Sequence, residues 1–331
     1  MEGENSMKAM MKAGVLGTLA ATAGTTALAQ SCDWAPDRAV TYIVPWGAGG
    51  GTDANSRMMA SMLEQKWDVP FNVVNRTGGN GVTGHSAIAT ADPDGYTVGA
   101  VTVEINTMHW VGLTDLTYEN ITPLALIDIV PASVLVGNDS QFETINELLD
   151  FARENPGELT ASGTSLGGIW HLALAGMLNA EDMDPGAIRW IPSQGAAPAL
   201  QELIAGGVDI ATPALSEGKV LVDSGEIRAL AYMHDEPMAA LPDVPLTAVE
   251  LDSGWTLAAY ITTSGPEGMP EEIACAYEQA ISEIVETEEW AEFKAGRGAD
   301  VVFVGGDDLT AYMEAQDAAL GGTIEAVGLA Q

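Results

Sequence analysis

The chain has 331 residues, in which 47 Asp and Glu face 12 Lys and Arg, for a formal net charge of −35 at pH 7. This balance excludes a nucleic-acid-binding protein, because phosphate contacts need Lys and Arg. A mean hydropathy of +0.12 excludes a disordered acidic chain, and the length suffices for two domains with their own cores. The scattered acids suggest a surface adapted to a saline environment, where salt screens repulsion.

The N-terminal segment, residues 1–29, is expected to be a signal peptide with cleavage after Ala29. Two lysines precede the small apolar run 13–23, which is too short for a mature transmembrane helix. A poor lipobox precedes Cys32, so we expect a soluble exported protein rather than a lipoprotein. Export permits a disulfide between Cys32 and Cys275, and two separate buried thiols are the alternative.

Short apolar runs alternate with helical patterns along the rest of the chain. Strands are expected at 39–45, 71–75, 97–103, 132–136, 159–162, 188–191, 210–211, 228–232, 257–262 and 301–303. Helices are expected at 53–65, 84–91, 144–155, 168–178, 197–205, 270–286, 288–295 and 307–320. This alternation predicts an α/β fold with largely parallel sheets. We expect two lobes, with residues 30–127 and 248–331 in the first, residues 128–247 in the second, and a ligand cleft between them.

The most informative segment is the glycine-rich loop after the first strand, Trp46-Gly-Ala-Gly-Gly-Gly-Thr-Asp53. Its glycines expose backbone N–H groups, and the helix that follows adds positive potential, so the favoured ligand is an anion. Either Thr52 or Asp53 is expected at the N-cap. The spacing matches neither a Walker A loop nor a dinucleotide fingerprint. Thr102 and Glu104 end the third strand at the same edge, where Glu104 either binds an amino group or faces solvent.

The second lobe supplies three further loops after strands. They are Ser162-Gly-Thr-Ser-Leu-Gly-Gly-Ile-Trp-His171, the turn 192–198 with Gly195 at its bend, and Thr212. Their hydroxyl and N–H groups are suited to a second carboxylate. The candidate ligand-binding residues are Trp46, Gly47, Ala48, Gly49, Gly50, Thr52, Asp53, Thr102, Glu104, Ser162, Thr164, Ser165, Gly167, Gly168, His171, Gln194, Gly195 and Thr212.

An enzymatic interpretation rests on Gly163-Thr-Ser-Leu-Gly167, which matches the G-x-S-x-G nucleophile elbow. Only Asp209 or Asp223 with His234 would complete a triad, and chance matches are common in a glycine-rich chain. We therefore expect no catalytic residues. The histidines show no metal-ligand spacing, so no metal or cofactor is expected, and His171 is expected to brace its loop.

From residue 39 to residue 320 the chain resembles the periplasmic solute-binding proteins of tripartite tricarboxylate transporters, the Bug family. Besides the first loop, the resemblance rests on Asn75-Arg76, Pro93-Asp-Gly-Tyr96, His171-Leu172, Gly195-Ala-Ala-Pro-Ala-Leu200, Gly206-Gly-Val-Asp209, Arg228-Ala-Leu-Ala231 and Leu241-Pro-Asp-Val-Pro245. It implies a two-lobed type II periplasmic-binding fold and a monomer in the periplasm. It also implies a small carboxylate held by the loops 46–53 and 162–168, and delivery to a permease with one large and one small subunit.

The chain departs from the family pattern at Pro192-Ser-Gln-Gly195, where the family usually has Pro-Tyr-Lys-Gly. An aromatic ring and a cation are therefore missing, and the arginines show no clustering in the loops. A mono- or dicarboxylate is favoured over a tricarboxylate for this reason. The alternative function is presentation of the ligand to a membrane sensor kinase, and the serine hydrolase is a weaker alternative.

Overall fold

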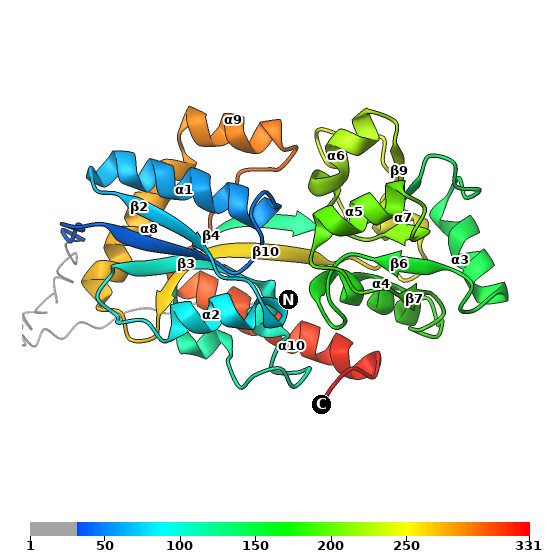
Figure 1. Ribbon diagram of the computed structural model, residues 1–331, viewed down its shortest axis with the longest axis horizontal. Coiled ribbons are helices and arrows are strands. Elements are labelled where there is room, and N and C mark those ends of the chain that lie inside the picture. Colours follow the sequence, from blue (N-terminus) through cyan, green and yellow to red (C-terminus); the bar gives the residue numbers. More distant parts are fainter. Residues whose placement is uncertain (1–31) are drawn as a thin grey trace, which may run out of the picture. The chain divides into compact units, whose positions relative to one another are not determined.

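The computed structural model describes residues 32–331 and arranges them in two five-stranded sheets with helices packed on both (Figure 1). The expected signal peptide lies outside the described residues. The strands are β1 (Val40–Val44), β2 (Phe71–Asn75), β3 (Thr97–Thr102), β4 (Ile121–Pro131), β5 (Ser133–Gly137), β6 (Thr160–Ser162), β7 (Arg189–Trp190), β8 (Ile210–Ala211), β9 (Ile227–Tyr232) and β10 (Ala258–Pro266).

The helices pack on the faces of these sheets. They are α1 (Gly51–Trp67), α2 (Val82–Ala89), α3 (Ile145–Glu154), α4 (Ile169–Ala180), α5 (Ala196–Ile204), α6 (Leu215–Asp223), α7 (Thr247–Glu250), α8 (Glu271–Val285), α9 (Glu288–Gly296) and α10 (Gly306–Ala326), with short 3-10 turns η1 (Gly79–Gly81), η2 (Val103–Asn106) and η3 (Tyr118–Asn120). Within residues 32–331, no helix has both the length and the hydropathy that crossing a membrane requires.

The first sheet has the strand order β2-β1-β3-β10-β4. Strand β1 is parallel to β2 and β3, whereas β10 is antiparallel to β3 and β4. Helices α1 and α9 lie on one side of this sheet and α2 and α10 on the other (Figure 1). Because β1 and β3 end at the same edge, their loops meet there, and the indole Nε1 of Trp46 donates to the Thr102 hydroxyl at 3.1 Å.

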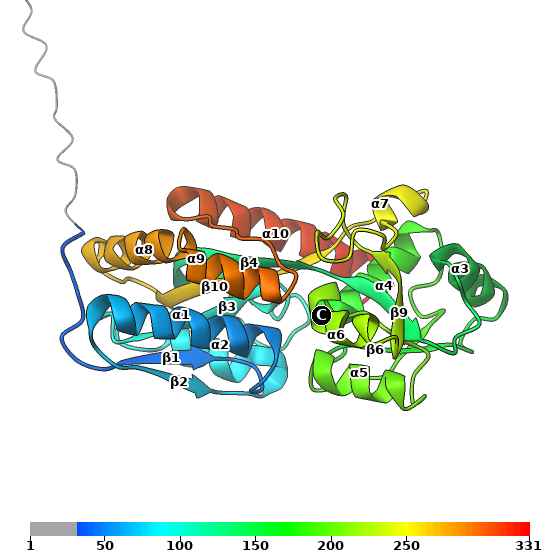
Figure 2. The same cartoon turned by 90° about the horizontal axis from the view of Figure 1, so that it is seen from above.

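The second sheet has the order β7-β6-β8-β5-β9, with β6 parallel to its two neighbours and β5 antiparallel to β8 and β9. The chain enters this sheet from β4 into β5 and returns from β9 to β10. At the crossing, the N–H of Ala132 donates to the Leu257 carbonyl at 2.9 Å. Helix α10 contacts both β4 and α4, so it also joins the two lobes (Figure 2).

The sheets are mixed rather than largely parallel as expected, because β10 is antiparallel to β3 and β4, and β5 is antiparallel to β8 and β9. Expectations about single elements also need correction. Strand β4 was not expected, because Pro123 and Asp128 interrupt its apolar pattern. Helix α6 was also missed, since Gly218 within it lowers helical propensity. The strand expected at 301–303 is absent from the described chain, and only the next residue, Val304, forms an isolated bridge, with Leu126.

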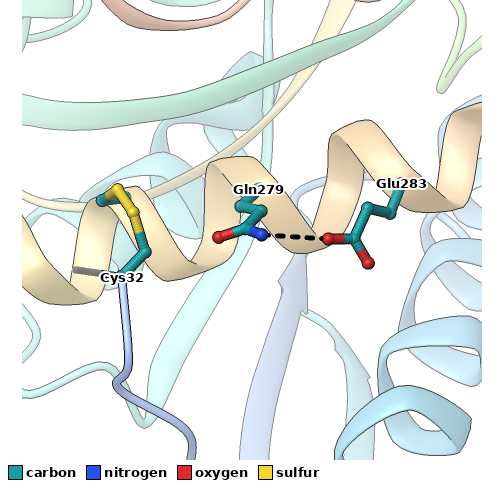
Figure 3. Close-up of a disulfide and its surroundings, with 4 residues drawn as sticks. Cys32, Gln279 and Glu283 are labelled. Carbon is teal, nitrogen blue, oxygen red and sulfur yellow. Dashed lines mark hydrogen bonds between the residues drawn. A yellow bond between two sulfur atoms is a disulfide. The ribbon is translucent and has the colours of Figure 1, made fainter. Parts of the chain in front are cut away.

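Cys32 and Cys275 form a disulfide that fixes the start of the described chain to α8 (Figure 3). On the same helix, Gln279 donates to Glu283 at 3.1 Å. Next to the bond, Trp34 packs against Tyr277 with ring centroids 5.5 Å apart. The N-terminal segment is thus held by a covalent bond and by aromatic packing.

A buried ion pair joins β4 to α9. Lys294 Nζ lies 2.5 Å from a carboxylate oxygen of Asp128, and the two side chains are 1% and 2% exposed. The amide of Asn55 in α1 donates to the other Asp128 oxygen at 2.9 Å. Burial raises the pKa of Asp128 and lowers that of Lys294, while the attraction between the two opposes both shifts.

We predict that Lys294→Met destabilises the protein by about 3–5 kcal/mol, because it leaves the Asp128 carboxylate buried without its counter-charge. Urea unfolding followed by circular dichroism measures this loss. The control is Lys66→Met, which breaks the exposed ion pair with Glu283 and should cost about 0–1 kcal/mol. Equal losses in the two variants would contradict the assigned role of the buried pair.

Candidate functional site

A cavity of about 270 Å³ lies where the loops of the two sheets face each other. Its wall comes from the β1–α1 loop, the end of β3, the first turns of α4, α5 and α6, and the segment after α9. The lining residues are Trp46, Gly47, Ala48, Gly50, Gly51, Thr52, Asn55, Thr102, Glu104, Asp128, Val130, Thr164, Ile169, Trp170, Gln194, Gly195, Ala196, Ala197, Pro198, Ala214, Ser216, Glu217, Ala259, Tyr260, Ile261, Arg297 and Ala299.

The glycine-rich loop presents the N-terminus of α1 to this cavity. The helix begins at Gly51 with Gly50 as its N-cap and with no side-chain cap, so the expectation of Thr52 or Asp53 at the cap is wrong. Gly49 has a φ of +88°, which favours glycine. The first N–H groups of α1 are therefore not satisfied by a capping side chain of their own helix.

Asp53 fixes the shape of this loop through hydrogen bonds made outside the cavity lining. Its Oδ2 accepts from the Gly49 N–H at 2.9 Å and from Arg57 Nε at 3.0 Å, and its Oδ1 accepts from the Asn75 amide at 2.8 Å. Burial opposes ionisation, but hydrogen bonds from Arg57, Gly49 and Asn75 outweigh it and hold the pKa of Asp53 below its usual value. Asp53 does not line the cavity.

A hydrogen-bonded chain orients Glu104 at the end of β3. Trp46 donates to the Thr102 hydroxyl, which donates to Glu104 Oε2 at 2.6 Å. The N–H of Thr102 donates to His85 Nε2 at 3.0 Å, and the other ring nitrogen donates to the Gly81 carbonyl at 2.8 Å. Burial lowers the pKa of His85 to about 4, so the ring is neutral.

Glu104 also contacts the opposite lobe. It is 3% exposed and accepts a hydrogen bond from the backbone of Ile169, the first residue of α4. Burial raises the pKa of Glu104, although the Thr102 hydroxyl and the backbone groups of Glu104 and Ile169 favour its ionised form. A carboxylate of the first lobe thus occupies the N-terminus of a helix in the second.

The loop before α4 is held mainly by its own polar side chains. Ser162 donates to the Ile191 carbonyl at 2.7 Å, and Thr212 donates to the Trp170 carbonyl at 2.8 Å. His171 accepts from the Gly167 N–H at 3.1 Å, and burial lowers its pKa to about 4. These groups brace the loop, as expected for His171.

Thr164 differs from these bracing residues. It lines the cavity and is 5% exposed, and its hydroxyl has no hydrogen-bond partner within the described chain. A Cβ atom on Gly168 would lie 2.5 Å from this hydroxyl, so glycine is needed there. An unpaired buried hydroxyl costs free energy unless a ligand or water completes it.

The turn before α5 forms another wall. Gly195, with a φ of +142°, is the N-cap and has no side-chain cap on the helix. The Ser193 hydroxyl fixes the turn by donating to the Gly195 carbonyl at 2.8 Å. Among residues 32–331, no acceptor pairs with the N–H groups of Ala196 and Ala197. This helix start therefore offers two backbone donors.

Sequence reasoning missed the charged residues of the cavity. Glu217, Arg297 and Asp128 all line it, and none of them lies in a glycine-rich loop between a strand and a helix. Burial raises the pKa of Glu217 to about 7, against the lowering effect of backbone hydrogen bonds from Ala214 and Gly51 and of the Arg297 charge. The arginine that appeared isolated in the sequence therefore lies at the site.

The expected ligand-binding residues divide into two groups. Those that line the cavity are Trp46, Gly47, Ala48, Gly50, Thr52, Thr102, Glu104, Thr164, Gln194 and Gly195. Those that the structure places outside its lining are Gly49, Asp53, Ser162, Ser165, Gly167, Gly168, His171 and Thr212. The second group consists of residues that shape or flank the loops rather than face the cavity.

Comparison with known proteins identifies the family of the chain. The sequence profile described as tripartite tricarboxylate transporter family receptor, TctC, matches residues 56–329. The chain belongs to this family. The protein BugT of Bordetella pertussis is 28% identical over 309 residues, which are 90% of this chain and 92% of BugT. The TctC receptor is thus also a relative of a Bug protein.

Two solved structures share the fold of this TctC receptor. R. palustris Rpa4515, solved with adipate, is 27% identical, with a TM-score of 0.81 over 90% of this chain and 99% of that one. A TctC solute-binding protein from Polaromonas, solved without ligand, is 27% identical, with a TM-score of 0.69 over 88% of this chain and 99% of that one. The two-lobed periplasmic-binding fold predicted from the sequence is confirmed.

The TctC receptor is a solute-binding protein and not an enzyme. The residues of the hypothetical triad have other partners: Asp209 bonds Thr160, Asp223 pairs with Lys219, and His234 bonds the backbone of Glu236. Ser165 does not line the cavity. In the described range, no three His, Cys, Asp or Glu side chains are grouped to hold a metal ion.

We predict that Asp53→Asn destabilises the receptor by about 1.5–3 kcal/mol at pH 7, because charge-assisted hydrogen bonds hold the first loop. The folded-state pKa lies below the unfolded value of about 3.9, so this stabilisation is present above that pH and is lost as the pH falls through the folded pKa. Thermal unfolding of both proteins at pH 7 and near pH 2 measures the difference.

The control for this prediction is Asp150→Asn, which removes an exposed aspartate paired with Arg153 three residues later. It should change stability by less than about 0.5 kcal/mol at either pH. A difference between wild type and Asp53→Asn that stays constant down to pH 2 would contradict the role of the carboxylate charge.

Proposed function

We propose that this TctC receptor is exported to the periplasm, binds one small carboxylate in the cavity between its lobes, and delivers it as a monomer to a tripartite membrane transporter with one large and one small subunit. The observation that carries the proposal is the convergence of three glycine-capped helix N-termini, those of α1, α4 and α5, on one cavity. Helix N-termini with free N–H groups favour anions.

The chemistry of the wall supports a carboxylate of low charge. Donors come from the N–H groups of Ala196 and Ala197 and from the Thr164 hydroxyl, while Trp46 and Trp170 offer apolar surface. Among lining residues the cationic side chain is Arg297, and three acids share the wall with it. A tricarboxylate would lack counter-charges there, which favours a mono- or dicarboxylate. The relative Rpa4515 was solved with adipate, a dicarboxylate.

We further propose that the receptor opens and closes about the chain crossings between its lobes. The segments that pass between the sheets are 131–133 and 256–258, near the boundaries predicted at 128 and 248. Closure brings Glu104 and Ile169 together, so a ligand that adds contacts across the cavity stabilises the closed form.

Isothermal titration calorimetry and intrinsic tryptophan fluorescence with a panel of mono-, di- and tricarboxylates test the proposal. The purified protein is first checked for retained ligand by mass spectrometry. We expect saturable binding of a mono- or dicarboxylate, with a fluorescence change from Trp46 or Trp170, and no turnover. Absence of binding across the panel, with no retained carboxylate, would contradict the proposed function.

We predict that Gly50→Leu lowers the affinity for that carboxylate at least about tenfold, or 1.4 kcal/mol, because the side chain enters the cavity. The fold should persist, since Gly50 has φ −78° and ψ 176° and a Cβ atom there would meet only the Gly47 carbonyl, at 3.7 Å. The control is Gly322→Leu on the exposed side of α10, where nothing lies within 4 Å. Unchanged affinity in Gly50→Leu would contradict the assignment of the first loop to the binding site.

A further inference from the structure

The N-terminus of α1 already has an anionic partner from the opposite lobe. Glu217 accepts a hydrogen bond from the Gly51 backbone, and a Cβ atom on Gly51 would lie 3.4 Å from Glu217 Oε1 and 3.7 Å from Arg297 Nη2. The carboxylate of Glu217 thus lies between a helix N-terminus and a guanidinium. The same environment would stabilise a carboxylate group of a ligand.

Position along α6 explains how Glu217 reaches this place. Ala214 is the N-cap of α6, and Glu217 is the third helical residue, whose side chain turns back to the backbone of Ala214. Gly51 has no side chain to separate Glu217 from the start of α1. If Glu217 only capped α6, it would need to contact only the backbone of Ala214. Its proximity to Gly51 and Arg297 therefore goes beyond helix capping.

Among the described residues, side-chain carboxylates of the opposite lobe therefore contact only two of the three helix N-termini. Glu217 meets α1 and Glu104 meets α4, whereas the first N–H groups of α5, at Ala196 and Ala197, have no acceptor within the described chain. The unpaired hydroxyl of Thr164 lines the same cavity and is 5% exposed. Among these three helix starts, that of α5 is therefore the one that no side-chain carboxylate of residues 32–331 approaches, and it offers a place for a ligand carboxylate.

We propose that Glu217 is the specificity-determining residue of this site: it holds the place at α1 where a second ligand carboxylate would bind, and so restricts the receptor to monocarboxylates. The inference rests on the proposed function. The far end of the preferred ligand is uncharged or donates a hydrogen bond, because the acceptors Glu217 and Glu104 face it. A dicarboxylate would bring its second charge against Glu217.

Charges around Glu217 make this selection depend on pH. Arg297 and Asp128 face it, Lys294 pairs with Asp128 behind the wall, and the α1 N-terminus adds positive potential. Since its pKa is raised to about 7, Glu217 is largely ionised above that pH and largely neutral below it. Exclusion of dicarboxylates is expected to weaken as the pH falls from 8 to 6, a range in which dicarboxylic ligands stay ionised.

Calorimetry with matched pairs of acids tests the proposal. Each pair contains a dicarboxylate and the ω-hydroxy monocarboxylate of the same carbon number, from succinate to adipate. At pH 8 the wild-type receptor should bind the best ω-hydroxy acid at least about tenfold more tightly than its dicarboxylate partner. Glu217→Ala should bind that dicarboxylate at least about tenfold more tightly than the wild type does, because Arg297 and the α1 N–H groups become available.

Two further variants separate charge from structure. Glu202→Ala removes an exposed acid of α5 outside the cavity and should keep the wild-type preference. Glu217→Gln retains the shape of the side chain, so it tests charge alone if Glu217→Ala does not fold. It should lose most of the discrimination against dicarboxylates and its dependence on pH between 6 and 8.

The outcomes distinguish this inference from the proposed function. Equal or tighter binding of the dicarboxylate by the wild type would overturn the role of Glu217 and leave a carboxylate receptor. An unchanged preference in both Glu217 variants would do the same. Absence of binding by any acid to any variant would instead contradict the proposed function.

Discussion

Every α-helix leaves its first N–H groups without intrahelical acceptors, and in this receptor three helices direct those groups at one cavity. None of α1, α4 and α5 has a side-chain cap, because Gly50, Gly168 and Gly195 occupy the cap positions. The acceptors must then come from elsewhere. Two are carboxylates of the opposite lobe, Glu217 and Glu104. In the mechanism that we propose, the same helix starts govern lobe closure and ligand binding.

This arrangement also gives the anion binding that we propose a physical basis within a chain of net charge −35. Attraction arises from oriented backbone dipoles at short range rather than from a cluster of basic side chains. Of the two cations near the cavity, Lys294 pairs with Asp128, and the charge of Arg297 already acts on both Glu217 and Asp128. The cavity wall therefore offers little positive charge to compensate for each further negative charge on a ligand.

The sequence allowed the fold and the loops to be predicted because both depend on local signals. Glycines after apolar strands mark tight turns before helices, and their order identifies the family. Local signals did not distinguish residues that line the cavity from those that brace the loops. Ser162 and Thr212 have the same chemistry as Thr164, but their hydroxyls bond backbone carbonyls while that of Thr164 is unpaired.

The charged residues of the cavity could not be found from local signals, since they depend on tertiary packing. Asp128 lies in a strand whose pattern is interrupted by proline, and Glu217 lies in a helix that contains Gly218. Arg297 follows α9, far in sequence from the loop that it approaches. Tertiary contacts bring these residues together at the cavity. The spacing of residues within any single segment does not predict those contacts.

A crystal structure of the receptor with its tightest-binding monocarboxylate tests the central claim most directly. Our account predicts that the ligand carboxylate accepts hydrogen bonds from the Ala196 and Ala197 N–H groups and from the Thr164 hydroxyl, while Glu217 stays at Gly51. A ligand carboxylate bound at the N-terminus of α1, with Glu217 displaced from it, would contradict the account.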